Sequence, residues 1–165
     1  FIDDETDAIY ANLDYVNKNK EKIKHRVSKS KYIISNKFVS KFICFIPSTT
    51  FFFKKKILDE GITFDTDINY GMDKDLFAQI YHKNFNIRKL EKNFALFRLH
   101  ENNKFEYKKG LKYVMIDLNE GILIYNKYST IKIPKNFFGL FVYAFIRFIL
   151  KCLGFIMFNL FNRTK

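Results

Sequence analysis

The alternation of apolar and polar positions predicts a β-strand at the start of the chain. Residues Ala8–Val16 alternate in the way expected of a half-buried strand. The next stretch, Lys18–Lys31, is basic with little hydrophobic period, so we predict a solvated loop or a frayed helix. A second short strand is predicted to run up to Phe53, with Pro47 at its entry, because Thr and Phe favour extended backbone.

The middle of the chain carries two helical patterns. Lys54–Glu60 is predicted to form one or two helical turns, closed by Gly61 in the left-handed conformation. Asp73–Lys83 has an apolar stripe, with Asp at its front and Lys at its back, as a helix dipole favours. In the loop between them, Phe64 is expected to fill the core.

Two short strands and a helix are predicted next. The strands are expected over Asn86–Leu90 and Phe94–Leu99, from their alternating pattern. Apolar residues then recur at helical spacing between Leu111 and Ile122, which predicts an amphipathic helix with Gly110 at its weak start.

The last segment, Phe137–Phe161, is almost entirely apolar and long enough for one membrane span of ~20 residues. Arg147 and Lys151 lie in its middle, four residues apart, and form a narrow polar stripe on a helix. Burying both cations costs roughly 2.5–3.5 kcal/mol each. We therefore place a helix lying on the membrane surface first, a span second and packing in a soluble domain third. The expected lipid-facing residues are Phe141, Phe145 and Phe148, with Arg147 and Lys151 among the headgroups.

Composition narrows the class of protein. The 165 residues include 29 Lys+Arg and 17 Asp+Glu, for a net charge of +12, and 48% are hydrophobic. Global disorder is excluded by this hydrophobic content, and the positive charge indicates an anionic partner: nucleic acid, a membrane surface or a phosphorylated substrate. Cys44 and Cys152 lie in apolar surroundings without a Cys-x-x-Cys pair, so we expect two buried free thiols in a reducing compartment.

Four short motifs follow one another along the chain. They are Ser48–Phe53 (Ser-Thr-Thr-Phe-Phe-Phe), Gly61–Asp65 (Gly-x-x-Phe-Asp), Met72–Phe77 (Met-Asp-x-Asp-Leu-Phe) and Phe97–His100 (Phe-Arg-x-His). In this order and with these gaps, they resemble the C-terminal, acceptor-side half of a family-2 glycosyltransferase of GT-A fold. The similarity covers roughly Ala8–Lys104.

The resemblance implies an α/β fold in three parts. Residues 1–104 would form the C-terminal part of a GT-A (Rossmann-like) domain, residues 105–130 an amphipathic helical extension, and residues 131–165 a membrane-associating hydrophobic segment. The family's nucleotide-binding half, with an Asp-x-Asp motif that binds Mg²⁺ or Mn²⁺, would lie upstream of Phe1. The chain is therefore expected to be a fragment that has no transferase activity alone.

Asp73 matches the catalytic base of the family that the chain resembles. Transfer of a sugar with inversion needs a carboxylate that takes the proton of the acceptor hydroxyl, and a helix start suits such a group. As an alternative, Asp73 is a plain helix N-cap. Asp75, in the same turn, is expected to have a structural role, with orientation of the acceptor as the alternative.

Arg98 and His100 share one face of a predicted strand and are expected to contact the diphosphate or a metal ion. The alternatives are an ion pair with Glu101 and a hydrogen-bonded histidine. Ser48, Thr49 and Thr50 would line the acceptor side, although strand propensity explains them equally well.

Two positions depart from the family pattern. Gln79 stands where relatives commonly carry an Arg, and Asn12 where they often carry an Asp. An ion pair made by that Arg must therefore be lost or supplied from elsewhere.

The predicted function is part of an inverting glycosyltransferase of the hexosyltransferase type, in cell-surface glycan synthesis. Its partners would be a nucleotide-sugar donor, a glycan or lipid-linked sugar acceptor and the cytoplasmic face of a membrane, bound peripherally or monotopically. The alternatives are a basic nucleic-acid-binding module and a non-catalytic membrane-associated remnant. We expect no nucleic-acid partner, because the basic stretch Lys18–Lys31 lacks the interleaved aromatics that stack on bases.

Overall fold

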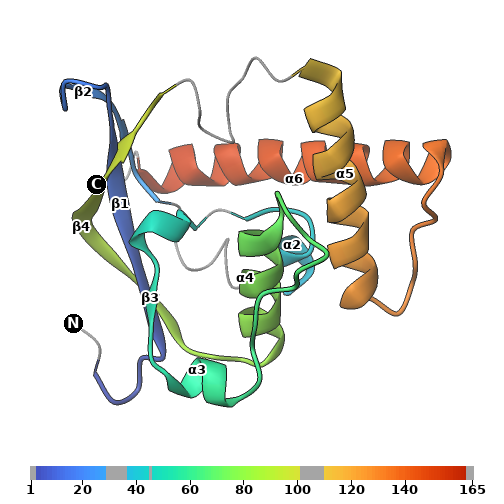
Figure 1. The fold of residues 1–165 in the computed structure, drawn as a ribbon, viewed down its shortest axis with the longest axis horizontal. Helices are drawn as coiled ribbons and strands as arrows, with labels where there is room; N and C mark the ends of the chain where they lie inside the picture. Colours follow the sequence, from blue (N-terminus) through green and yellow to red (C-terminus); the bar gives the residue numbers. More distant parts are fainter. Residues whose placement is uncertain (1–2, 29–36, 45, 101–109, 163–165) are drawn as a thin grey trace.

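The computed structural model describes residues 3–28, 37–44, 46–100 and 110–162. Within them the chain is a mixed α/β protein (Figure 1). The elements are β1 (Ala8–Val16), β2 (Lys22–Arg26), α2 (Lys37–Ser40), the 3-10 turn η1 (Ser48–Thr50), β3 (Phe52–Phe53), α3 (Lys56–Asp59), α4 (Met72–His82), β4 (Ile87–Arg98), α5 (Gly110–Lys127) and α6 (Phe137–Asn162).

The sheet is built around β1. Strand β4 runs parallel to β1 from Ala8, which pairs with Ile87, to Val16, which pairs with Arg98. Strands β2 and β3 are antiparallel to β1. Because β4 occupies one edge of β1 throughout, β2 and β3 share the other edge, at opposite ends of it. The result is a mixed sheet of four strands.

Strand β2 corrects the prediction for Lys18–Lys31. That stretch was expected to be a loop or a frayed helix, yet Lys22–Arg26 pairs with the second half of β1. Its side chains are largely exposed on both faces, so the strand has no hydrophobic period to reveal it. Backbone pairing with a buried neighbour holds it in place instead.

Strand β4 corrects the prediction of two short strands. It is one strand of 12 residues. Its register against β1 jumps from the pair Tyr10–Lys89 to the pair Asn12–Asn93, so β4 carries extra residues at this point. Such a bulge interrupts the alternation of apolar side chains, and this interruption looks like a gap between two strands in the sequence.

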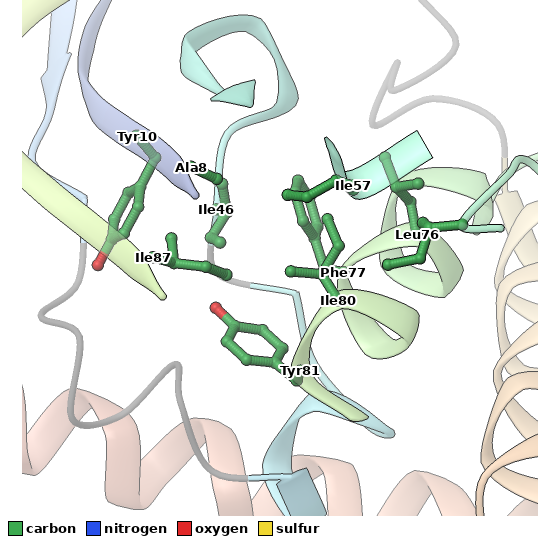
Figure 2. Close-up of a cluster of buried hydrophobic side chains, with 10 residues drawn as sticks. Ala8, Tyr10, Ile46, Ile57, Leu76, Phe77, Ile80, Tyr81 and Ile87 are labelled. Atoms are coloured by element: carbon green, nitrogen blue, oxygen red, sulfur yellow. The ribbon is translucent and has the colours of Figure 1, made fainter. Parts of the chain in front are cut away.

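The first core cluster lies between the sheet and helices α3 and α4 (Figure 2). Its buried members are Ala8, Tyr10, Ile46, Ile57, Ile62, Leu76, Phe77, Ile80, Tyr81 and Ile87. The apolar stripe predicted for the helix that begins near Asp73 is confirmed, since its residues Leu76, Phe77, Ile80 and Tyr81 belong to this cluster. The expectation for Phe64 is wrong: its side chain is 51% exposed, whereas Ile62 and Ile68 of the same loop are buried.

A second cluster joins α5, α6 and the segment directly after α2, and Tyr143 of α6 is buried in it. The Phe42 ring stacks on Tyr143, with 5.2 Å between centroids, and lies 4.9 Å from the Tyr125 ring. Gly121 makes this approach possible, because a Cβ atom there would lie 2.6 Å from Cζ of Tyr143. Helix α6 is therefore attached to the rest of the chain by one of its faces.

Several local predictions are confirmed. Strand β1 has the predicted bounds, α4 is shifted by one residue, and Gly61 ends the turns of α3 with φ of +77°. Ser48–Thr50, however, forms a 3-10 turn rather than a strand, and the paired strand is limited to Phe52–Phe53.

Candidate functional site

The candidate site is the first turn of α4, which carries Asp73 and Asp75. The N-terminal end of this helix points to the same end of the sheet as the carboxyl ends of β1 and β4, toward the top of Figure 1. In α/β proteins, ligands commonly bind at the carboxyl ends of parallel strands. The helix begins at Met72 after Gly71, so Asp73 is not its N-cap residue.

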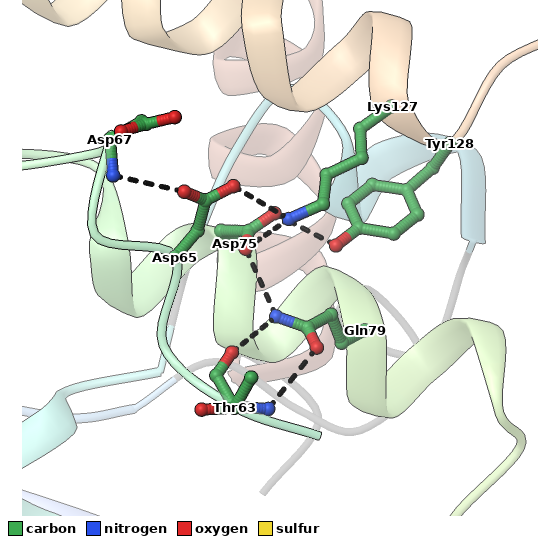
Figure 3. Close-up of polar contacts among 7 residues, drawn as sticks. All are labelled: Thr63, Asp65, Asp67, Asp75, Gln79, Lys127 and Tyr128. Carbon is green, nitrogen blue, oxygen red and sulfur yellow. Dashed lines mark hydrogen bonds and ion pairs between the residues drawn. The ribbon is translucent and has the colours of Figure 1, made fainter. Parts of the chain in front are cut away.

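Asp75 is completely buried and fully engaged (Figure 3). Its carboxylate accepts hydrogen bonds from Nζ of Lys127 at 2.9 Å, the Tyr128 hydroxyl at 2.8 Å and Nε2 of Gln79 at 3.0 Å. Lys127 also bonds Asp65 at 3.0 Å. Burial alone disfavours the charged amine, but these bonds raise the pKa of Lys127 above its usual value. This geometry leaves Asp75 no route to a substrate.

The hydrogen bonds around Asp75 show the role of Gln79, which stands where the family that the chain resembles commonly has an Arg. Gln79 bridges the backbone of Thr63 and the carboxylate of Asp75, with Nε2 donating to the Thr63 carbonyl oxygen at 2.8 Å. The positive charge beside Asp75 comes instead from Lys127, at the end of α5. Sequence reasoning missed Lys127 and Tyr128, because neither belongs to any of the four motifs.

Asp73 differs from Asp75 in each of these respects. Its side chain is half-buried, and no residue in the described part of the chain donates a hydrogen bond to its carboxylate. It lies near Cys44, where burial raises the pKa of the thiol to about 12 and the charge of Asp73 adds to the rise. Asp73 therefore keeps a carboxylate that is available for a ligand.

Glu120 of α5 fixes the loop that leads into α4. Its buried carboxylate accepts the backbone N–H groups of Asn69, Tyr70 and Gly71 at 3.1, 2.8 and 2.6 Å. A Cβ atom at Gly71 would lie 3.0 Å from Cδ1 of Ile124, which explains the glycine. The one sequence signal for this role is an acidic residue among the apolar positions of a predicted helix.

Lys74 connects the same turn to α6. Its side chain is buried and donates a hydrogen bond to the hydroxyl of Tyr143. Burial, followed by the charge of Arg147, lowers the pKa of Lys74 to about 7. Arg147 itself pairs with Asp117 of α5. Helix α6 therefore directs Tyr143 and Arg147 toward α4 and α5.

The hydroxyl residues expected on the acceptor side divide into two kinds. Thr50 is fully buried, and its Oγ1 donates to the Ala11 carbonyl oxygen at 2.9 Å, which holds η1 against β1. Ser48 and Thr49 are exposed. Asn12, the other departure from the family pattern, accepts the backbone N–H of Ser28 at 2.8 Å.

Arg98 and His100 lie at the carboxyl end of β4. Arg98 is the last residue of the strand, pairs with Val16 and is exposed; His100 follows it, also exposed. No ion pair joins Arg98 to Asp73 among the described residues. Glu101, the suggested alternative partner, lies outside the described residues.

A metal site is not formed by the part of the chain that the structure describes. No three His, Cys, Asp or Glu side chains there gather closely enough to hold a metal ion. The described residues alone therefore provide no ligand set for the expected Mg²⁺ or Mn²⁺.

The residues expected to face lipid lie on α6. Phe141, Phe145 and Phe148 are 62%, 55% and 64% exposed, and Lys151 is also exposed. Residues Phe137–Ile156 are long and apolar enough to cross a membrane by length and composition, which by itself is weak evidence of location. Cys152 is exposed on the same helix and Cys44 is half-buried, so the expectation of two buried thiols is wrong for Cys152 and met only in part by Cys44.

Comparison with protein-family models and with curated proteins gave no match. The fold and the site define a mixed α/β protein with an available aspartate at a helix start. The likeness to a family-2 glycosyltransferase rests on the residues of the four motifs.

Proposed function

We propose that this chain is the acceptor-side part of an inverting glycosyltransferase and that its sheet and α4 belong to a GT-A fold. Asp73 is the general base. The observation that supports this most directly is the contrast within one helical turn. Asp75 is buried and accepts three hydrogen bonds, while no described residue donates a hydrogen bond to the Asp73 carboxylate. The described residues thus support one aspartate as a structural group and the other as a reactive one.

The reaction is a single displacement at the anomeric carbon of a nucleotide sugar. Asp73 accepts the proton of an acceptor hydroxyl as its oxygen forms the new glycosidic bond. The bond between the sugar and the diphosphate breaks on the opposite face, and the electron pair leaves with the diphosphate. The N-terminal end of α4 favours the ionised carboxylate that this step requires.

Positioning of the base comes from α5. Glu120 holds the backbone of residues 69–71, directly before the helix, and Lys127 holds Asp75, one turn along from the helix start. A general base must lie within hydrogen-bond reach of the proton that it takes, so a fixed helix start contributes to the rate.

The other site residues have supporting roles in this proposal. Arg98 offers its guanidinium to the leaving diphosphate, and His100 donates or accepts a hydrogen bond beside it. The exposed hydroxyls of Ser48 and Thr49 bond the acceptor, a glycan or a lipid-linked sugar of the cell surface. Donor recognition and the divalent cation belong to the upstream half of the enzyme.

The test is Asp73→Asn in the intact enzyme, with Asp75→Asn as the matched control. Loss of a general base lowers the rate by roughly 10²–10⁴-fold. We expect Asp73→Asn to lower kcat by about that factor while donor binding and thermal stability stay unchanged. Asp75→Asn should lower the thermal stability, because it weakens a buried ion pair.

The two variants keep the outcomes apart. Near-normal turnover in the Asp73→Asn enzyme would contradict the base assignment, whereas absence of turnover in the unsubstituted protein would favour a non-catalytic remnant. In another outcome, both variants lose turnover only in proportion to their loss of folded protein. Asp73 would then be a structural residue, as Asp75 is.

A further inference from the structure

We propose that α6 lies in the plane of an anionic membrane surface, with one defined face in the lipid. This lipid face consists of Phe141, Phe145, Phe148, Cys152 and Phe155. At about 100° per residue these positions fall on one side of the helix. The four Phe side chains are 55–64% exposed and Cys152 is exposed, so none of the five is covered by the described residues.

The opposite side of α6 is occupied by protein. Tyr143 is buried against Phe42 and Lys74, and Gly154 is buried eleven residues further on. Arg147, between them, pairs with Asp117 of α5. The helix therefore has a fixed rotation about its axis, and the apolar face points away from the sheet and the other helices.

This attachment favours a helix in the membrane plane over a spanning helix. A span would draw Asp117, Glu120 and Lys74 toward the hydrocarbon, because they lie beside the middle of α6 or on the helices packed against it. Charged groups in hydrocarbon are strongly disfavoured. A helix in the plane buries only its apolar face and leaves these groups in water.

The charge around the lipid face indicates which surface it meets. Lys132 and Lys135 are exposed just before α6, and Lys151 is exposed on its flank. The whole chain carries a net charge of +12. Lysines that flank an apolar helix face add electrostatic attraction to anionic headgroups, so the occupant is a bilayer of anionic lipid, at the cytoplasmic face of a membrane.

The first experiment measures binding of the 165-residue chain to vesicles. We expect the chain to sediment with vesicles of phosphatidylcholine and phosphatidylglycerol, and more weakly with phosphatidylcholine alone. Replacing Phe141, Phe145 and Phe148 together by Ser should weaken binding at least ~10-fold, since buried apolar area supplies much of the affinity. In the control, Phe52 and Phe64 are replaced by Ser. These two Phe residues are 50% and 51% exposed but lie outside α6.

Circular dichroism of each variant shows that it is folded. Equal loss of binding in the α6 variant and the control, or no vesicle binding by the parent chain, would overturn the proposal. A dimer that forms at the same concentrations without lipid, and that the α6 substitutions abolish, would identify a second copy as the occupant and would also overturn it.

The second experiment distinguishes a helix in the plane from a spanning one. The chain has no Trp, so a single Trp placed at 141, 148 or 155 is a unique fluorescent probe. Quenching by lipids brominated at different depths then locates each probe. We expect the same shallow depth at all three positions, whereas positions 141 and 155 are ~21 Å apart along a helix axis. A depth difference approaching that value would overturn the proposal in favour of a span.

This inference does not depend on the proposed catalysis. An inactive Asp73→Asn enzyme that still binds vesicles leaves it standing, and failure to bind vesicles leaves the base assignment standing. The two proposals therefore fail separately.

Discussion

Lys74 of α4 donates a hydrogen bond to the hydroxyl of Tyr143 on α6, and both side chains are buried. The Tyr143 hydroxyl also lies 3.4 Å from the Phe42 carbonyl oxygen, to which it donates. Lys74 follows the candidate base Asp73 directly in the sequence. The proposed lipid-binding helix and the candidate catalytic turn are therefore joined through one side-chain contact.

The stability of the protein should depend on the protonation of Lys74. The pKa of Lys74 is lowered from 10.5 to about 7 in the folded state. Between these two values the unfolded state binds the proton and the folded state does not, so stability rises with pH and the gain is lost as pH falls toward 7. We expect the free energy of unfolding to increase by ~2 kcal/mol from pH 7 to pH 9.

Urea unfolding at several pH values measures this, with Lys74→Met as the comparison. The charged or titratable groups that act on Lys74 are Arg147, Asp117, Cys44 and Lys151. The pKa of Cys44 is raised from 9.0 to about 12, so its opposite contribution begins only near the upper end of the chosen pH range. An equal increase in Lys74→Met would show that another group causes the dependence.

Replacement of Gly121 by Ala should separate α5 from α6. The new Cβ atom would lie 2.6 Å from Cζ of Tyr143, and the ring is held by Phe42. Overpacking of this kind costs about 1–3 kcal/mol, which a shift in the urea midpoint measures. If the clash is the cause, Gly121→Ala should cost much less in a Tyr143→Leu background. A cost that stays the same there would point to a backbone effect instead.

Loss of the Glu120 carboxylate should loosen the start of α4. Glu120→Ala leaves the N–H groups of Asn69, Tyr70 and Gly71 without their acceptor, at a cost of about 1–3 kcal/mol for an unsatisfied buried group. Hydrogen exchange should become faster at these three amides and stay unchanged in β1. The control is Glu91→Ala, which removes an exposed carboxylate on β4. It should change neither the stability nor the exchange rates of the amides of residues 69–71. Unchanged exchange at residues 69–71 in Glu120→Ala would contradict the role of Glu120.

Much of the fold could be predicted from the sequence where the signal is local. The helix of Met72–His82 and the strand of Ala8–Val16 follow from periodicity within a single element. The short strand β2 could not be predicted, because its polar side chains do not show which neighbour its backbone pairs with. The sequence predicted two strands in place of β4, because its bulge breaks the alternation of apolar and polar side chains.

The candidate site shows the same division. The sequence placed Asp73 and Asp75 together at a helix start through the Met-Asp-x-Asp pattern alone. It could not separate their environments, because two of the three donors to Asp75 are Lys127 at the end of α5 and Tyr128 directly after it, 52 and 53 residues further along. The acceptor for the loop at Gly71 is likewise 49 residues away, at Glu120.

The sequence by itself determined that the chain is a basic α/β protein whose last helix is apolar with one narrow polar stripe. Helical periodicity suffices for that, since it depends only on neighbours in the sequence. Only the tertiary structure decided which way the stripe faces. Arg147 of the stripe lies against α5, where it pairs with Asp117, and Tyr143 beside it contacts Lys74 of α4, while Lys151 and the Phe side chains stay exposed. Long-range packing sets the rotation of a helix, and periodicity carries no information about the partner.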